Sequence, residues 1–412
     1  MENWEAFGAE LRRLRLQAGL SVRELARRLN YDPGALSGFE NGRRKPPADI
    51  VRKLDRVLES DGALAAIYES LVAAATDVDQ SNLLRLRESA ASAERRYIDR
   101  ALVKDLSELL SETRRLEDQV GSKLVLPLGV RQTPVASALA IEARKSARAD
   151  MVDVAAGWQQ FTGWLHANLG NHAAAVQHYR AALELAAESG NRDMHSTALS
   201  MRGHVAWMAG EIGPMLGLSR AAQRDRDALT PAVLALAVQQ EGRGHAIEGD
   251  LDAMEAKLDK AAELVARGDP EQPDAQYFYS DSFIEMQRGL AYRLARQWDK
   301  AVASLNRGLA GFDPDILTSE WATWYVAELA CALAGSGEPE AACRRASDAL
   351  RVAGATPGSR LTRFIRVLHR EMSAKWTTND AVDAVGEELR QSHSDCWSKR
   401  SDADYPSWQC LS

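Results

Sequence analysis

The chain has 412 residues and a formal net charge of −7, with 45% hydrophobic and 26% charged residues. This composition is that of a folded globular protein, and it excludes collagen-like, low-complexity and disordered classes. The length suits two domains, each large enough to bury its own core.

Positive charge is concentrated near the N-terminus. Residues 12–56 hold twelve Lys and Arg against five Asp and Glu, a local net charge of +7, so the rest of the chain carries −14. The whole-chain charge therefore hides a compact basic element joined to an acidic body.

Targeting and cysteine signals are few. No segment approaches the roughly 18 apolar residues of a membrane span, and residues 1–8 do not resemble a secretory signal, so we expect a cytoplasmic protein without membrane contact. The four cysteines, Cys331, Cys343, Cys396 and Cys410, contain no Cys-x-x-Cys pair. We therefore expect neither a disulfide framework nor a zinc site.

The first 60 residues are divided into short helices. Apolar spacing is helical here and almost throughout the chain, which predicts an all-α fold. Gly19 ends the first helix, Ser21 and Glu24 are spaced as a capping box for the second, and Pro33 begins the third. A fourth helix follows Pro47. This pattern of lengths is typical of a helix-turn-helix domain.

The composition shifts after this basic element. Residues 61–121 are rich in Ala, Leu, Ser, Glu and Arg without strong breakers before Gly121, which predicts connecting helices with a flexible joint at 81–95. We place a first domain at 1–70, a helical linker with the first solenoid helices at 71–150, a repeat domain at 151–391 and a tail at 392–412. For the tail, docking on the repeats and disorder both stay open.

A glycine pattern repeats beyond residue 150. Pairs of glycines seven positions apart precede Ala-rich helices, and the first glycines of successive pairs are 40 and 39 residues apart. Small residues let the two helices of a hairpin approach closely, and each hairpin buries its open face on the next. The pattern predicts an α-solenoid. The clear pairs are Gly163 with Gly170, Gly203 with Gly210 and Gly242 with Gly249; degraded units pass through Gly289 and Gly337.

Two stretches carry family resemblances. Residues 21–29 (SVRELARRL) and 36–46 (LSGFENGRRKP) closely resemble the Xre family of lambda-type repressors. Residues 163–170 (GWLHANLG) and their echoes resemble tetratricopeptide repeats, with a period longer than the usual 34 residues. The combination is similar to actinobacterial Xre-type regulators that carry a repeat-built sensor domain.

The resemblance implies that the helix from Pro33 lies in the major groove of DNA. The family's base-reading positions fall on Pro33, Gly34 and Gly38, which cannot hydrogen-bond a base edge, so direct readout is expected to be poor. Ala35 is a candidate for a thymine methyl. Polar candidates are Tyr31, Asp32, Ser37 and Asn41, and capping or packing is the alternative role for Asp32 and Ser37.

Basic side chains flank this helix. We predict phosphate contacts for Arg43, Arg44 and Lys45 in the following loop, and for Arg23, Arg27 and Arg28 on the second helix. The resemblance also implies an internal pair between Glu40 and Arg15, and Leu25, Leu29, Leu36 and Phe39 are core by spacing. One such domain buries little area, so we expect a homodimer on double-stranded DNA.

Stacked hairpins create a concave face lined by the first helix of each pair, which suits a peptide, small-molecule or protein effector. The resemblance implies signalling peptides or partner proteins. The aromatic cluster at 277–283 is either a lid or a dimer contact, and hairpin core is the alternative for each aromatic ligand candidate. In register, the face holds Gln160, Trp164, Asn168, His204, Trp207, Gln239, Arg243 and Met286.

Common catalytic and phosphate-binding motifs are absent from the sequence, so we expect no enzyme and no cofactor. The leading hypothesis is a transcriptional regulator in which effector binding changes the spacing of two DNA-reading heads. One alternative is an interaction scaffold that has lost base recognition, which Pro33, Gly34 and Gly38 motivate. The other is an antitoxin-like protein that holds a partner and binds DNA only for autoregulation.

Overall fold

The computed structural model describes residues 4–29, 31–42, 44, 46–58, 60, 62–68, 98–268, 276, 278–312, 316–353 and 360–391. All regular structure in these residues is helical, which confirms the predicted fold class. The chain forms two compact units, Met1–Tyr97 and Ile98–Ser412. The predicted joint at 81–95 and the tail at 392–412, with Cys396 and Cys410, lie outside the described residues.

Sequence signals set the ends of the helices in the first unit. Gly19 has a positive φ of 68° just beyond the first helix. The capping box is present: Ser21 N donates to Glu24 Oε2 at 2.7 Å, and Glu24 N donates to Ser21 Oγ at 3.2 Å. The helices are α1 (Glu5–Gln17), α2 (Val22–Leu29), α3 (Pro33–Glu40) and α4 (Ala48–Leu58), followed by a helical turn at 63–68.

Gly8 allows α1 to pass directly over the end of α3. A Cβ at this position would lie 2.5 Å from the Phe39 carbonyl oxygen, closer than any side chain tolerates. The predicted core residues Leu25, Leu29, Leu36 and Phe39 are all buried. Helix α3 is therefore held in place by its contacts with α1 and with the core of the first unit.

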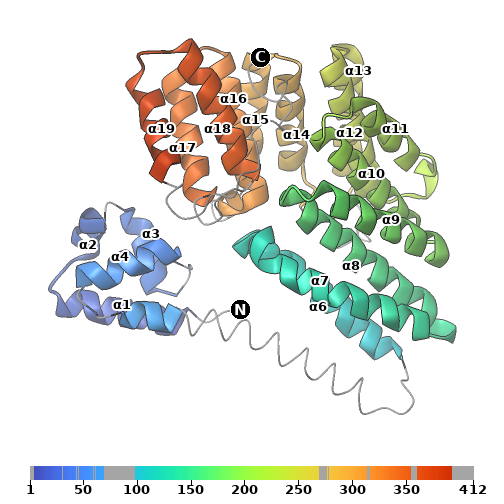
Figure 1. Ribbon diagram of the computed structural model, residues 1–412, viewed down its shortest axis with the longest axis horizontal. Helices are drawn as coiled ribbons and strands as arrows, with labels where there is room; N and C mark the ends of the chain where they lie inside the picture. Colours follow the sequence, from blue (N-terminus) through green and yellow to red (C-terminus); the bar gives the residue numbers. More distant parts are fainter. Residues whose placement is uncertain are drawn as a thin grey trace. The chain divides into compact units, whose positions relative to one another are not determined.

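The second unit is a series of antiparallel helix hairpins that follow one another in chain order (Figure 1). In its described residues, α6 pairs with α7, α8 with α9, and so on to α18 with α19. Short 3-10 helices lie at Lys145–Ala147, Arg226–Ala228 and Ile316–Thr318. The α-helices are α6 (Arg100–Val120), α7 (Ser122–Glu142), α8 (Arg148–Asn168), α9 (His172–Ser189), α10 (Arg192–Met208), α11 (Ile212–Ala222), α12 (Pro231–Glu248), α13 (Leu251–Ala266), α14 (Asp281–Leu294), α15 (Trp298–Ala310), α16 (Glu320–Gly335), α17 (Pro339–Ala353), α18 (Arg360–Lys375) and α19 (Asp380–Gln391).

The first glycine of each repeat lies where the two helices of a hairpin touch, as predicted. A Cβ on Gly163 would lie 2.8 Å from the Tyr179 ring of the partner helix. One on Gly289 would lie 2.8 Å from the backbone nitrogen of Leu305. A larger residue at either position would push the hairpin apart.

The second glycine of each repeat ends the first helix of its hairpin. Gly170, Gly210, Gly249 and Gly337 have φ values of 76°, 79°, 81° and 86°, a conformation that glycine adopts without steric cost. In the fourth repeat, which lacks this glycine, Arg296 adopts the same conformation with φ 58°. The turn is therefore retained where the sequence signal is lost.

Helix α7 corrects the expectation that no segment resembles a membrane span. By length and composition alone it is apolar enough to cross a membrane, although a bundle helix of a soluble protein passes the same test. Its inner face packs on α8, where Thr133 Oγ1 lies 2.8 Å from Thr162 Oγ1. Its outer face exposes four large apolar side chains: Leu124, Val130, Val135 and Ile141.

Candidate functional site

Helix α3 presents its first turn to solvent. Pro33 and Gly34 are exposed, whereas Leu36 is fully buried. Ala35, considered above for a thymine methyl, is also buried, and its methyl group belongs to the core rather than to an accessible surface. The exposed face of α3 thus presents backbone groups and small residues, and few side chains that can hydrogen-bond a base edge.

The polar candidates near α3 each make a local bond. Asp32 is the N-cap, and its Oδ1 accepts from Ala35 N at 2.7 Å. Asn41 Nδ2 donates to the Ser37 carbonyl at 2.8 Å, and the Tyr31 ring lies 5.9 Å from that of Phe39. These contacts support the capping and packing roles; DNA contacts by Tyr31, Asp32, Ser37 and Asn41 stay a prediction.

Basic groups lie beside this helix. Arg23, Arg27 and Arg28 are exposed on α2. A Cβ on Gly38 would lie 3.4 Å from Arg44 Cβ, an ordinary contact distance, so the loop after α3 lies against this part of the helix. Arg43 and Lys45 lie outside the described residues.

The predicted internal pair is confirmed. Arg15 Nε donates to Glu40 Oε1 at 2.5 Å and Nη2 donates to Oε2 at 2.8 Å, while Nη1 donates to the Leu20 carbonyl at 2.7 Å. Both side chains are buried, with exposures of 8% and 6%. The hydrogen bond that Arg15 donates to Glu40 raises the pKa of Arg15. This pair ties α1 to the end of α3, so its role is structural.

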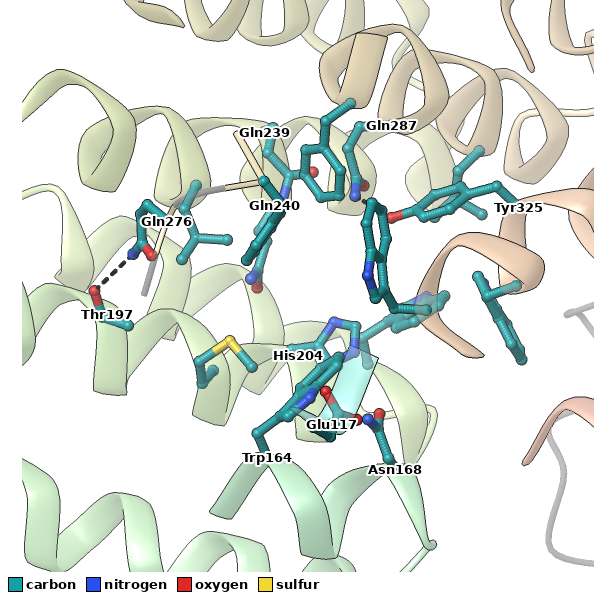
Figure 2. A pocket seen from close by; sticks show the side chains of 18 of the residues that line it. Glu117, Trp164, Asn168, Thr197, His204, Gln239, Gln240, Gln276, Gln287 and Tyr325 are labelled. Atoms are coloured by element: carbon teal, nitrogen blue, oxygen red, sulfur yellow. Dashed lines mark hydrogen bonds between the residues drawn. The ribbon is translucent and has the colours of Figure 1, made fainter. Parts of the chain in front are cut away.

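A cavity of about 180 Å³ opens inside the second unit, lined by the first helices of successive hairpins (Figure 2). At roughly 15 Å³ for each water, it holds on the order of ten waters or a small organic molecule. Its walls are largely apolar and aromatic, with Phe161, Trp164 and Trp321 among them. This combination of apolar wall and a few polar groups is typical of ligand sites.

The cavity lining follows a register set by the hairpin glycine. In α10, α12 and α14, the residues six and two positions before this glycine and one position after it all face the cavity. These offsets lie on one side of a helix, opposite the face on which the glycine meets the second helix of the hairpin. The lining residues at these positions are Thr197, Met201, His204, Leu236, Gln240, Arg243, Phe283, Gln287 and Leu290.

A chain of hydrogen bonds connects side chains on four of the helices that line the cavity. Arg243 Nη1 bonds His204 Nδ1 at 3.2 Å, and Arg243 Nη2 donates to Gln287 Oε1 at 2.6 Å. Gln287 Nε2 in turn donates to the Tyr325 hydroxyl at 2.5 Å (Figure 2). The chain links α10, α12, α14 and α16 at the cavity wall, so these side chains are fixed before any ligand binds.

The bond from Arg243 sets the tautomer of His204. A guanidinium can only donate, so Nδ1 is the acceptor and the neutral ring carries its proton on Nε2. Burial, followed by the nearby charges of Arg243 and Arg360, lowers the pKa of His204 well below its usual value. His204 is therefore neutral at pH 7, and its buried Nε2–H has no hydrogen-bond partner among the described residues.

Two arginines of the cavity lining pack on tryptophan rings. The guanidinium carbon of Arg243 lies 4.5 Å from the centre of the Trp207 ring, and that of Arg360 lies 5.2 Å from Trp207 and 3.7 Å from Trp324. Burial lowers the pKa of Arg243 to about 10, so it stays charged at pH 7. The aromatic faces stabilise these cations only in part.

Seven of the eight ligand candidates proposed from the sequence line this one cavity: Gln160, Trp164, Asn168, His204, Trp207, Gln239 and Arg243. Met286 does not; it is fully buried and faces Gly308 of the partner helix α15. Their ligand contacts stay predictions. In the aromatic cluster, Phe278 and Phe283 form part of the cavity wall and the Tyr279 ring lies 4.9 Å from that of Phe283, whereas Tyr277 is outside the described residues.

Sequence reasoning missed the contributions of three helices. Helix α6, assigned above to the linker region, lines one side, and α16 and α18 close another. Only the aromatic density of α16 signalled a role, since none of these helices has a glycine that fixes the register. The residues missed there are Arg114, Glu117 and Asp118 on α6, Trp321, Trp324 and Tyr325 on α16, and Arg360 and Leu361 on α18.

Comparison with known proteins gives a family match for the first unit. Residues 6–66 match the family model of a helix-turn-helix domain. This match and the geometry of α2 and α3 support a DNA-binding regulator. No curated protein matches the chain. Among solved structures, the crystal structure of BtubC (BKLC) from P. vanneervenii is similar at 21% identity, with a TM-score of 0.38, covering 55% of this chain and 91% of that chain.

Proposed function

We propose that this protein is a cytoplasmic, non-catalytic transcriptional regulator of the Xre type, which binds DNA as a homodimer and binds an effector in the cavity of its tetratricopeptide-like unit. One observation carries the proposal: a chain whose residues 6–66 match a helix-turn-helix domain also holds a preformed, mostly apolar cavity with convergent polar groups. Effector binding regulates DNA binding if it favours one arrangement of the dimer.

DNA binding rests on charge more than on base reading. The start of α3 carries Pro33 and Gly34, and the exposed Arg23 and Arg27 lie on the preceding helix. Phosphate contacts supply affinity and fix orientation without sequence information. Sequence preference then arises from the shape and deformability of the DNA.

The test is a titration of the full-length protein with its own promoter region and with random duplex, each at several salt concentrations. We expect tighter binding to the promoter. The Arg23→Ala/Arg27→Ala variant should weaken binding to both duplexes alike and lower the salt slope by about one unit for each lost contact. Arg13→Ala is the matched control, because Glu10 holds its guanidinium at 2.6 Å.

Equal affinity for promoter and random duplex would favour the scaffold alternative. The lack of base-reading side chains at Pro33, Gly34 and Gly38 is the specific observation behind that alternative. A loss confined to one sequence in the double variant would contradict phosphate contact by Arg23 and Arg27.

Helix α7 supports the homodimer. Its outer face exposes Leu124, Val130 and Ile141 by 70%, 46% and 72%, and apolar patches of this kind mark interfaces. A second copy of the same helix covers such a face symmetrically. By light scattering after size exclusion, we expect a dimer, and a monomer for Leu124→Glu/Val130→Glu. Lys260→Glu, an exposed change on α13, is the control, and an unchanged dimer in the double variant would place the interface elsewhere.

A further inference from the structure

The cavity carries buried positive charge that the described residues do not balance. Arg243 is 3% exposed, and its hydrogen-bond partners, His204 and Gln287, are both neutral. No carboxylate in the described part of the chain lies within ion-pair distance of Arg243 or Arg360. Burying an unpaired guanidinium costs several kcal/mol, so a fold that keeps Arg243 buried and the half-buried Arg360 near the same tryptophan ring has a reason beyond packing.

Glu328 is the buried acid whose charge acts most on these arginines, and it forms an ion pair with another arginine. Its side chain is fully buried, and its Oε2 lies 2.7 Å from Nε of Arg293. Arg293 and Glu328 balance each other, which leaves Arg243 and Arg360 as net positive charge. Glu117 and Asp118 line the cavity from α6, where Glu117 accepts from the Ser122 hydroxyl at 2.5 Å.

Unused hydrogen-bond donors lie in the same place. Arg243 Nε, Arg360 Nη2 and His204 Nε2 are buried and have no partner among the described residues. All three belong to side chains that line the cavity. Buried polar groups are normally paired, so these three unmatched donors indicate a missing acceptor, while the unmatched Oε1 atoms of Gln239 and Gln240 on the same lining indicate a missing donor.

We propose that the cavity binds an organic anion, whose carboxylate is held by Arg243 and Arg360 and whose apolar body lies against the aromatic wall. A carboxylate accepts two N–H bonds from a guanidinium and completes the unmatched donors. Leu236, Phe283 and Trp321 provide the apolar wall. This inference rests on the proposed function, in which the cavity is the effector site, and it names the chemical class of the effector.

The test compares two probes of the same shape, 2-naphthoate and the uncharged 2-naphthamide, by calorimetry on the full-length protein. We expect naphthoate to bind at least about tenfold more tightly, because hydrogen bonds to a charged group are stronger than neutral ones. Arg243→Met and Arg360→Met should each reduce this preference towards one. Arg243→Lys keeps the charge and should keep part of the preference for naphthoate. Arg370→Met is an exposed change on the same helix as Arg360 and should leave this preference unchanged.

A cavity-filling variant, Leu236→Trp, tests separately whether the cavity is a ligand site and whether its ligand is an anion. If it blocks both probes but wild type shows no preference for naphthoate, the cavity is a ligand site and the anion inference is wrong. If neither probe binds at millimolar concentration, or if Leu236→Trp does not weaken their binding, the assignment of the cavity as the effector site is wrong. Should Arg243→Met fail to fold, the half-buried Arg360 gives the same answer.

Two sources provide such an anion: a small carboxylic acid and the C-terminus of an apolar peptide. Competition against naphthoate distinguishes them, with a short apolar peptide used once with a free and once with an amidated C-terminus. Displacement by the free peptide but not by its amide assigns the site to peptides. Displacement by neither leaves the small acid as the ligand class. Equal displacement by both peptides contradicts recognition of the carboxylate.

Discussion

The two units bury arginine in opposite ways. In the first unit, Arg15 donates to both oxygens of Glu40 and to the Leu20 carbonyl, so its charge and donors are matched within the fold. In the second unit, Arg243 and Arg360 lie on tryptophan faces, and Arg243 bonds only neutral groups. A matched buried charge stabilises the chain itself, whereas an unmatched one indicates where another molecule completes the site.

The second unit can match a buried charge away from the cavity. Glu241 on α12 is 5% exposed and accepts from Arg220, Gln223 and Lys257 at 3.0, 2.9 and 2.5 Å. Arg220 lies on α11, Gln223 directly follows that helix and Lys257 lies on α13, so the carboxylate ties two hairpins together. Arg202 and Arg363, outside the cavity, also have an unmatched nitrogen but are only half-buried, so Arg243 differs from them in being almost completely buried.

The largest expected effect comes from breaking the matched pair in the first unit. Glu40→Ala leaves Arg15 buried without its counter-charge, which should destabilise this unit by about 3–5 kcal/mol. The measurement is hydrogen exchange of peptides from α1 and α3 in the full-length protein. DNA binding should fall in parallel, because α3 loses its anchor.

Two variants control this prediction. Arg15→Met/Glu40→Leu removes both charges and should recover most of the lost stability. Asp49→Ala breaks an exposed pair with Lys53, 3.5 Å apart, and should change stability by less than about 0.5 kcal/mol. A small effect of Glu40→Ala alone would show that the buried pair is not what holds α3.

Local signals made much of this fold predictable. The capping box at Ser21 and Glu24 and the left-handed glycines act within one turn of the chain, so the sequence displays them directly. The hairpin glycines set the helical register, and the register placed most ligand candidates on one cavity. It failed at Met286, which is one residue, or about 100° of helix, from Gln287, the residue that lines the cavity.

The rest depends on contacts between distant helices. Arg360 belongs to a helix without a glycine to fix its register, so its packing on Trp207 and Trp324 has no sequence signal. The balance of charge likewise requires knowing that Glu328 forms an ion pair with Arg293. Composition showed a basic segment at 12–56 within an acidic chain, yet the unmatched cations that define the candidate site lie in the second unit, outside that segment.

Close packing sharpens the comparison, since the two helices of a hairpin in the second unit meet at a glycine. Gly289→Ala should destabilise it by about 1–3 kcal/mol, because the added Cβ meets Leu305 at 2.5 Å. Thermal unfolding followed by circular dichroism measures this. Gly217→Ala is the matched control: nothing lies within 4 Å of its Cβ, and alanine should stabilise α11 by up to about 1 kcal/mol. Equal effects of the two changes would refute the packing role.

The smallest effect concerns the matched charge of the second unit. Burial opposes ionisation of Glu241, but the hydrogen bonds from Lys257, Gln223 and Arg220 prevail and lower its pKa to about 2. Because the folded pKa lies below the unfolded value near 4.5, ionised Glu241 stabilises the fold above pH 4.5, and this contribution is lost as the pH falls towards 2. Glu241→Gln should therefore be less stable than wild type at pH 6, and the difference should shrink on acidification.

Urea denaturation at several pH values, read by hydrogen exchange of α12 peptides, measures that difference. The exposed Glu263→Gln on α13 controls for the loss of one negative charge. A gap between wild type and Glu241→Gln that stays constant from pH 6 to pH 2.5 would mean that the carboxylate contributes by shape alone. The contrast between matched and unmatched buried charge would then no longer hold within the second unit, and the case for a missing anion at Arg243 would rest on the unused donors.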